Sequence, residues 1–393
     1  MDVGDRVREI MQGFAARTGL EPEAGAPRRY LWTDAFAVCN FLGLSQREAG
    51  DESLRIALRL VDQVHRTLGR HRPDDARKGW ISGLDEEQGA RHPTAGGLRI
   101  GKDLPERRVG EPYDAVLEWE RDGPYLHYLT RWMHALDRVA RATGDSKYAL
   151  WARELGKRAF SSFVVTDAGG TPRGLYWKMS IDLSRPLVPS MGQHDPLDGF
   201  LVCARLQSAS QAAKICNLER EVRALREICR GRRWETDDAL GIGGLLTDAH
   251  ALAGMIVDGI LDEVRLLESL LEACRSGLEI LRRIRFLDAP AESRLPFREL
   301  GLTIGLRALP DLQARIARAR GAFESFDRLD AALDALAAYR PWVSRVEQFW
   351  LDPVNRREPN WVGHREINEV MLATSLAPAG YLGIADPRPS VPK

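Results

Sequence analysis

Cysteine is scarce in this chain of 393 residues, and its spacing matches no metal site or dithiol pair. The five cysteines are Cys39, Cys203, Cys216, Cys229 and Cys274. No CxxC pair occurs, and four of the five fall in expected helices, which argues against zinc and against a disulfide framework. The dispersed histidines also lack the spacing of metal ligands, so we expect neither a metal nor another cofactor.

An excess of charge of one sign is also lacking, because 56 lysines and arginines face 56 aspartates and glutamates. Without a basic field, a nucleic-acid partner is not expected. No run of 18 uncharged apolar residues is present, so we expect no membrane span. Residues 1–14 are charged and amphipathic, unlike a signal peptide. These features predict a cytoplasmic protein and leave its oligomeric state open.

Several common motifs are missing as well. The sequence contains no P-loop, no GxGxxG that opens a helix after a strand, no HExxH and no GxSxG. Alternation of apolar and polar residues, the pattern of a strand, is confined to residues 163–180. We expect a small β-hairpin there, with a turn at Gly169 and Gly170, inserted into an otherwise all-α protein.

What the chain does contain is a strict alternation of two kinds of helix. Helices with one apolar face, which is typical of an outer position, are expected at 3–18, 51–69, 145–164, 217–231, 262–285 and 323–349. Helices that are apolar almost all round, which indicates burial, are expected at 28–44, 122–142, 195–209, 237–256, 294–308 and 364–377.

Six alternations predict six helical hairpins closed into a double ring, an (α/α)6 toroid that forms one domain over residues 1–393. The links from outer to inner helices include the long stretches 70–121, 165–194 and 350–363. Long loops in a compact domain are usually functional. In such a ring they would share one face with the N-termini of the inner helices, which favour anions and hydroxyl-rich ligands. A solid helical bundle with decorated loops is the alternative.

This organisation resembles the six-hairpin, or (α/α)6 toroid, superfamily of glycoside hydrolases, unsaturated-uronide hydrolases and N-acylglucosamine 2-epimerases. The segment GHREINEVMLATSL (363–376) is similar to the Gly-His-x-x-Glu helix opening of the epimerases. It matches at Gly363 and His364, but Glu366 stands one position early. The epimerases' second histidine motif and the tryptophan-rich signature of the uronide hydrolases are not found. The resemblance implies a saccharide or glycoside substrate.

Two inner-helix openings carry candidate catalytic groups. Tyr30, Trp32 and Asp34 open the first inner helix, where a carboxylate must be paired or face a wet cavity. A helix-start carboxylate tied to its neighbours is the structural alternative for Asp34. His194 and Asp198 stand at the third inner helix, around an Asp195-Pro196 pair that is typical of an N-cap followed by proline.

Further candidates are substrate-binding residues. Trp361, His364 and Glu366 stand at the last inner helix, and an indole before a helix start is a platform for a sugar ring. The alternative is a packed Trp361 and a helix-capping His364. The remaining candidates are Trp80 in the glycine-rich loop, which could close as a lid, Trp177 and Lys178 in the hairpin, and His127 in the second inner helix.

Three hypotheses follow. The first is glycoside hydrolysis by two carboxylates, with Asp34 and Asp198 as the pair and the tryptophans as subsites. The second is epimerisation or isomerisation of a sugar by histidine acid–base chemistry, with His194 and His364 in the two roles. The third is a toroid that binds a saccharide without catalysis. Facing carboxylates, facing histidines, or neither would distinguish them.

Overall fold

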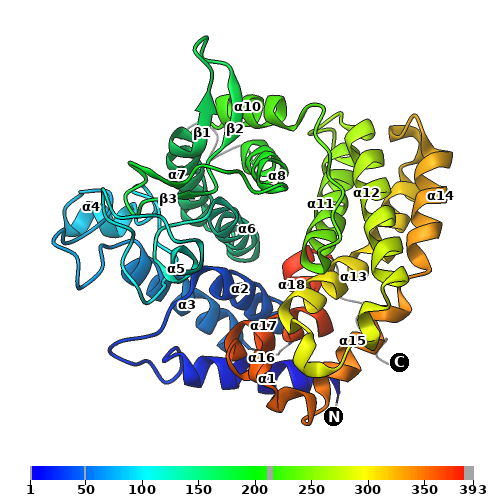
Figure 1. Cartoon of the computed structure of the whole chain (residues 1–393), viewed down its shortest axis with the longest axis horizontal. Coiled ribbons are helices and arrows are strands. Elements are labelled where there is room, and N and C mark those ends of the chain that lie inside the picture. Colours follow the sequence, from blue (N-terminus) through cyan, green and yellow to red (C-terminus); the bar gives the residue numbers. More distant parts are fainter. Residues whose placement is uncertain (1, 48–49, 210–215, 385–393) are drawn as a thin grey trace. The chain divides into compact units, whose positions relative to one another are not determined.

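A computed structural model describes residues 2–47, 50–209 and 216–384 of the chain (Figure 1). Helices account for 63% of the structure and strands for 5%, which confirms the all-α class. Closure of the helices into a ring stays a prediction.

The chain divides into two compact units. The first comprises Met1–Phe14, Cys39–Leu54 and Trp234–Lys393, and the second comprises Ala15–Val38 and Arg55–Arg233. The boundaries fall inside three helices: α1 (Val3–Arg17), α2 (Leu31–Ser45) and α3 (Glu52–Leu68). That both units belong to one domain stays a prediction.

In the second unit, α6, α7, α8 and α10 form a helical group. Its helices are α4 (Glu86–Arg91), α5 (Ala115–Glu120), α6 (Leu126–Thr143), α7 (Ser146–Phe163), α8 (Asp195–Ser208) and α10 (Glu219–Cys229). The α6 helix packs against α7 and α8, and α8 packs against α10. Gly144 ends α6 in the left-handed region at φ 71°, and Asp145 then caps α7 by accepting from Lys147 N. This tight reversal makes α6 and α7 an antiparallel pair.

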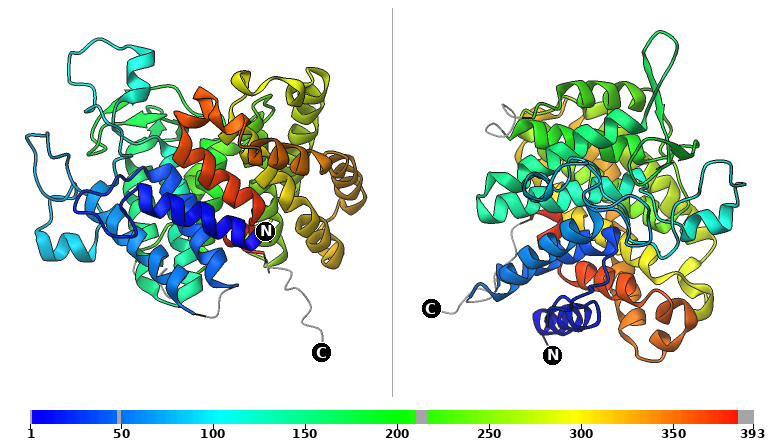
Figure 2. Two further views of the ribbon diagram at one scale, coloured as in Figure 1. Left: turned by 90° about the horizontal axis from the view of Figure 1, so that it is seen from below. Right: turned by 90° about the vertical axis from the view of Figure 1, so that its left-hand side faces the viewer.

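The expected β-hairpin is present but ends earlier than predicted. Strands β1 (Val164–Thr166) and β2 (Pro172–Leu175) pair antiparallel, and their hairpin projects at the top of the right-hand view in Figure 2. The chain turns at Gly170, where φ is +79°. Residues 178 and 179 belong to a second hairpin, in which β3 (Lys178–Met179) pairs with β4 (Pro186–Val188). The single hairpin over 163–180 is therefore corrected to two.

The first unit is built around two long buried helices that lie side by side in Figure 1, α11 and α13. Its helices after residue 234 are α11 (Ala239–Val257), α12 (Val264–Arg283), α13 (Pro296–Arg318), α14 (Phe326–Ala337), α15 (Pro341–Leu351), α16 (Pro359–Val362), α17 (Arg365–Leu376) and α18 (Ala379–Leu382). Short 3-10 turns occupy Phe286–Asp288, Ala291–Ser293, Arg320–Ala322 and Asn355–Arg357.

Glycines bring α11 and α13 into backbone contact. A Cβ atom at Gly243 of α11 would overlap the carbonyl group of Gly301 in α13, and one at Gly305 would overlap the backbone of Gly243. The three glycines therefore form a seam along which the two helices approach more closely than any side chain would allow.

Most of the twelve predicted helices are present, with two clear errors. The expected helix 323–349 is two helices, because the chain turns at residues 338–340 before Pro341, whose ring nitrogen has no hydrogen to donate. The expected helix 294–308 continues to Arg318 and carries Pro310 within it. Beyond residue 308 the helix stays buried on one face, at Leu309, Leu312 and Ile316.

Of the described helices, α11 alone is long and apolar enough to cross a membrane. Its most apolar stretch is 67% buried inside the protein, as in a core helix. Its apolar character is therefore explained by packing against α12 and α13.

Candidate functional site

Five of the predicted site residues gather in the second unit, at the N-terminal ends of α2 and α6 and on the turn before β3. Seven rings connected by contacts of 5.0–5.7 Å between centroids form what we call the aromatic cluster: Tyr30, Trp32, Trp119, Tyr125, His127, Tyr128 and Trp177. Tyr30, Trp32, His127 and Trp177 were predicted, and Lys178 lies under the cluster with its Nζ 4.9 Å from the centroid of Tyr125.

The cluster runs from the interior to the surface. Trp32 contacts His127 and Tyr128 at 5.7 and 5.6 Å, and both of these contact Tyr125 at 5.7 Å. Tyr125 in turn stacks on Trp119 at 5.1 Å. Trp32 is only 8% exposed, whereas Trp119 is 44% exposed. A ligand that reached the inner rings would therefore meet aromatic surface from the solvent inward.

Two charged pairs join α6 to α8 beside these rings. His127 Nδ1 lies 3.4 Å from Asp195 Oδ1. One turn further along each helix, Arg131 Nη2 donates to both carboxylate oxygens of Asp198, at 3.0 and 3.2 Å. The pairs form because positions 127 and 131 share a face of α6, as 195 and 198 do on α8. The Arg131 guanidinium also lies 5.9 Å from the Trp32 ring.

Two buried polar atoms at this place have no partner among the described residues. They are the indole Nε1 of Trp32 and the Oδ2 of Asp195, on side chains of residues 8% and 5% exposed. One is a donor and the other an acceptor. Buried polar groups are paired in the great majority of cases, and an exception is often a functional site or the place of a bound molecule.

Asp34 is held in the way that its structural alternative predicts. Its Oδ2 accepts from Tyr30 N at 2.9 Å, and Oδ1 lies 3.5 Å from Arg29 Nη1. Burial raises its pKa to about 6, against the lowering effects of Arg29 and the Tyr30 N–H. A carboxyl group with such a pKa carries a proton for part of the time near neutral pH. Both oxygens nevertheless face protein groups, which favours a role in fixing the start of α2.

The tyrosines of the cluster are neutral hydroxyl groups. The Tyr30 and Tyr128 hydroxyls share a short hydrogen bond. Burial raises the pKa of Tyr30 to about 12 and that of Tyr128 well above its usual value. Because each ring stays protonated, this pair supplies hydrogen-bond donors rather than bases.

The contacts of Lys178 give it a structural role. Its Nζ donates to the carbonyl oxygens of Glu118 and Arg121 at 2.5 and 2.8 Å and lies 3.2 Å from Glu118 Oε1. Burial lowers its pKa to about 8. The ammonium group is surrounded by acceptors of its own loop, so it anchors α5 below the ring of Tyr125.

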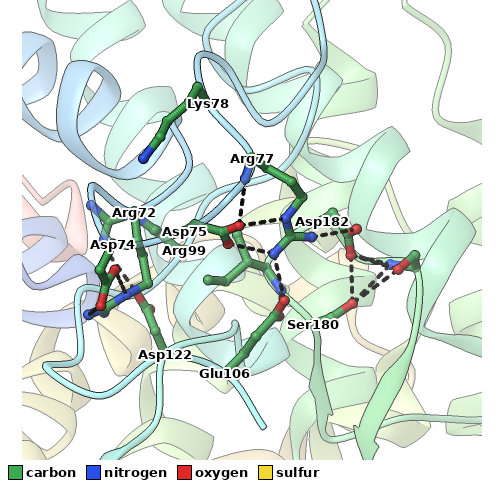
Figure 3. Close-up of polar contacts among 12 residues, drawn as sticks. Arg72, Asp74, Asp75, Arg77, Lys78, Arg99, Glu106, Asp122, Ser180 and Asp182 are labelled. Carbon is green, nitrogen blue, oxygen red and sulfur yellow. Dashed lines mark hydrogen bonds and ion pairs between the residues drawn. The ribbon is translucent and has the colours of Figure 1, made fainter. Parts of the chain in front are cut away.

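The long loop 70–121 is cross-linked by ion pairs and is tied to the hairpin that follows (Figure 3). Arg77 donates to Asp75, Glu106 and Asp182 at 2.7–3.1 Å. The Arg77 guanidinium holds the pKa of Asp75 at about 2, and hydrogen bonds from Ser180 and Ser184 keep that of Asp182 equally low. The loop is thus fixed at several points, which is unlike the hinged lid that its glycines suggested.

A second part of this network is deeply buried. The carboxylate of Asp122 accepts from the backbone N–H groups of Ile100, Gly101 and Gly123 at 3.0–3.1 Å. It also pairs with Arg99 at 3.0 Å and with Arg72 at 3.4 Å (Figure 3). Asp122 does not cap α6, whose N-cap position is held by Tyr125. We call these seven residues the loop network: Arg72, Asp75, Arg77, Arg99, Glu106, Asp122 and Asp182.

Four predicted residues lie away from both the aromatic cluster and the charged side chains beside it. Trp80 is buried against Gly89, and the Arg70 guanidinium covers its ring at 4.2 Å. Trp361, His364 and Glu366 belong to the first unit. There Trp361 is buried and stacks on Trp350 at 5.5 Å, as its packing alternative predicted. His364 is exposed, begins α17 at the N-cap without a side-chain cap bond, and has Phe297 at 6.0 Å.

At α8 the order of the first residues differs from the prediction. His194 holds the N-cap position without a side-chain cap bond, and the helix begins at Asp195. The carboxylate of Asp195 therefore does not cap the helix, and one of its oxygens contacts His127. Sequence reasoning gave Asp198 more weight than Asp195, whereas Asp198 is the one whose oxygens are both paired.

Sequence reasoning missed Tyr128, Arg131 and Trp119. The signal for Arg131 was present, because it stands four residues after His127 on a helix. Tyr128 stands directly after His127 in the string PYLHYL. Trp119 lies on the short helix α5 within the long loop 70–121, and no periodicity links it to the residues that it contacts.

No group of three His, Cys, Asp or Glu side chains in the described part of the chain is arranged to hold a metal ion. Comparison with known protein families and with curated proteins finds no match to this chain.

Proposed function

We propose that this protein is a carbohydrate-active enzyme and that its substrate binds at the aromatic cluster. The observation that carries the proposal is the pair of buried, unpartnered atoms, Trp32 Nε1 and Asp195 Oδ2, beside aromatic rings. A sugar offers a C–H face to an aromatic ring and hydroxyl groups that both donate and accept. One donor, one acceptor and ring faces suit that combination.

The first candidate reaction is glycoside hydrolysis. It needs a carboxylate as base or nucleophile and a second group that delivers a proton. Asp195 has one oxygen without a partner among the described residues and stands in the first turn of α8. His127 lies against its other oxygen as a proton carrier. Asp198 then positions Arg131 beside Trp32, and Asp34 supports the helix that bears Trp32.

The second candidate reaction is epimerisation or isomerisation of a sugar. The contact between His127 Nδ1 and Asp195 favours it, because a carboxylate at one ring nitrogen fixes the orientation of the imidazole. Nε2 would then remove a proton next to the substrate carbonyl. His127 would then act as the acid–base group, a role for which the sequence alone suggested His194 and His364. A toroid that binds a saccharide without catalysis is the third possibility.

The toroid belongs to the same proposal. Support comes from the alternation along the chain of helices buried on all sides, such as α11, with helices buried on one face, such as α12. The cytoplasmic location expected from the sequence and the small saccharide as sole partner are proposed with it.

The reactions are separated by what happens to the carbon-bound hydrogens. The protein is incubated in heavy water with a panel of oligosaccharides and, separately, with free aldoses and N-acyl hexosamines. A hydrolase releases reducing ends and leaves the carbon-bound hydrogens in place. An epimerase introduces deuterium next to the carbonyl group. Protection of the fold against heat without either reaction would indicate the binding toroid.

Variants then assign the reaction to the cluster. Asp195→Asn is expected to lower turnover by about 10²-fold or more, within the range for general acid–base groups, and His127→Gln to do the same. Asp145→Asn and His92→Gln are the matched controls. Asp145 caps α7, and His92 lies 2.6 Å from Glu154, so each control changes the same residue type outside the cluster. Equal losses in the variants and their controls would remove the assignment.

A further inference from the structure

Unlike an ordinary surface helix, α5 exposes large apolar side chains and buries a carboxylate. Of its two charged residues, Glu118 is only 2% exposed, whereas the side chain of Glu120 is 63% exposed, Val116 is 80% exposed and Trp119 is 44% exposed. The exposed apolar residues extend along the loop on both sides of the helix start. We call the following set the apolar segment: Leu104, Val109, Tyr113, Val116, Leu117 and Trp119.

This inversion is fixed by buried ion pairs. Glu118 Oε2 accepts from Arg107 Nε at 2.9 Å, and its Oε1 lies 3.2 Å from Lys178 Nζ. The Lys178 ammonium is itself held in place, because it donates to the carbonyl oxygens of Glu118 and Arg121. Because Glu118 is held in the interior, Val116 and Trp119 of α5 face water. Apolar side chains gathered in this way on a surface commonly mark a binding site.

The apolar segment is continuous with the aromatic cluster through one residue. Trp119 is exposed on α5 and contacts Tyr125 at 5.1 Å and Trp177 at 5.3 Å. Tyr125 contacts His127, the proposed proton carrier, at 5.7 Å. A ligand with its reacting group at His127 would therefore place the group next to it over Trp119.

The chemistry of the segment decides which group that is. Valine and leucine side chains offer no hydrogen bonds to sugar hydroxyls. Charges near the segment are paired with one another: Glu111 with Arg121, Arg107 with Glu118, and Glu120 with Lys102 at 3.5 Å. A second sugar ring would lose the hydrogen bonds of its hydroxyl groups to water here without replacement, whereas an alkyl or aryl group would gain by burial.

We propose that the apolar segment binds the apolar aglycone of an amphiphilic glycoside whose sugar occupies the aromatic cluster. This proposal rests on the proposed carbohydrate function and specifies its substrate class. The apolar group contacts Val116 and Trp119, and the sugar lies at Trp32, His127 and Asp195. Binding of the apolar group contributes to affinity and alignment and takes no part in proton transfer.

The test compares two glycosides of the same sugar. Methyl and n-hexyl glycosides of glucose, galactose, mannose and N-acetylglucosamine are titrated by calorimetry below the concentration at which micelles form. The full chain is used throughout. For the sugar that binds, we expect the hexyl glycoside to bind at least about tenfold more tightly, because each buried methylene contributes about 0.8 kcal/mol. In Val116→Asp this affinity ratio should fall close to one.

A matched variant controls for surface charge. Val354→Asp in the first unit changes an equally apolar side chain that is 62% exposed and lies outside the apolar segment. It should keep the ratio of the unmodified protein. Val116→Ile, which retains an apolar surface, should keep it too.

Each other outcome overturns the proposal in a distinguishable way. Equal affinities for methyl and hexyl glycosides remove the aglycone site and leave the carbohydrate function standing. Failure of every glycoside to bind removes the carbohydrate function and the aglycone site together. Binding of n-hexanol alone or of phosphatidylcholine vesicles, lost in Val116→Asp, would assign the segment to lipid. Self-association lost in Val116→Asp, measured by sedimentation, would assign it to a second copy of the chain.

Discussion

The loop network and the aromatic cluster lie in the same unit, and they treat buried polar groups in opposite ways. In the loop network the buried carboxylate of Asp122 has three backbone donors and two arginines as partners. In the aromatic cluster one oxygen of Asp195 and the indole nitrogen of Trp32 have none among the described residues. Both regions are rich in conspicuous residues, yet only the second has unused hydrogen-bonding capacity.

The difference separates stability from binding. A buried carboxylate with all its partners stabilises a loop and has nothing left to offer a ligand. An unpartnered buried atom costs stability until a ligand meets it. The contrast is therefore a physical reason to look for function among the rings rather than in the larger array of charges shown in Figure 3. The following substitutions test it, in order of decreasing effect.

Asp122→Ala should give the largest loss of stability. It leaves Arg99 buried without its carboxylate and three backbone N–H groups without an acceptor. Breaking a buried pair in this way costs about 3–5 kcal/mol. Urea unfolding measures the loss. Asp145→Ala, which removes an exposed cap of α7, serves as the control at about 1 kcal/mol. Similar losses in both variants would contradict the special status of the loop network.

Asp34→Asn should change how stability depends on pH. The pKa of Asp34 is raised from its ordinary 3.8 to about 6 in the folded protein. Between these values the folded state binds more protons than the unfolded state, so stability falls as the pH rises. The stabilisation that protonated Asp34 contributes to the folded state is complete below pH 4 and lost above pH 6. It amounts to at most about 3 kcal/mol in the free energy of unfolding.

The asparagine variant lacks this slope, while the other titrating groups are common to both proteins. Chemical unfolding of both from pH 4 to pH 7 should therefore show the unmodified protein losing stability relative to Asp34→Asn. Parallel pH profiles would show that Asp34 is ionised throughout this range.

Two tryptophan substitutions compare a partnered with an unpartnered indole. Trp132 Nε1 donates to His65 Nε2 at 3.1 Å, and burial lowers the pKa of His65 to about 3, so this imidazole is a neutral acceptor. Trp132→Phe removes this hydrogen bond and leaves the buried His65 Nε2 without a donor. Trp32→Phe removes an N–H group that has no partner among the described residues. We expect Trp132→Phe to cost about 1 kcal/mol more. Thermal unfolding of the two variants measures the difference, and a larger loss in Trp32→Phe would reverse the comparison.

Asp195→Asn should have the smallest effect on the fold. One oxygen of the carboxylate has no partner, and the other has only a contact of 3.4 Å with His127. The amide has nearly the same shape, so the free energy of unfolding should stay within about 0.5 kcal/mol. A loss of several kcal/mol would mean that Asp195 is a structural residue like Asp122.

The helices could be predicted because their signal is local. Apolar periodicity located α8 and α11 within two residues, since burial of a helix face requires apolar residues at helical spacing. It failed at Pro341, where the run of apolar residues continues through a turn. It also failed at α13, whose last turns are buried on one face only. Neither helix ending is visible in a pattern that records burial rather than backbone hydrogen bonding.

The site could be predicted only in part, because its contacts are not local. Trp32 and His127 were identified from their positions at helix starts, which is a local feature. That Asp195 rather than Asp198 keeps an unpartnered oxygen depends on Arg131, which is 67 residues away from Asp198 in sequence. The inverted polarity of α5 depends on Lys178 and Arg107 in the same way. Pairing across such distances is set by tertiary packing and leaves no periodicity in the sequence.

The glycine seam between α11 and α13 restricts how this protein can evolve. At most contacts in a core, a larger residue on one side can be compensated by a smaller residue on the other. At Gly243 and Gly305 the atoms that an added Cβ would meet first are backbone atoms of Gly301 and Gly243, so no smaller residue on the other side can restore the fit. We therefore expect relatives that share this packing to keep Gly243 and Gly305 together, or to have replaced the close approach of the two helices altogether.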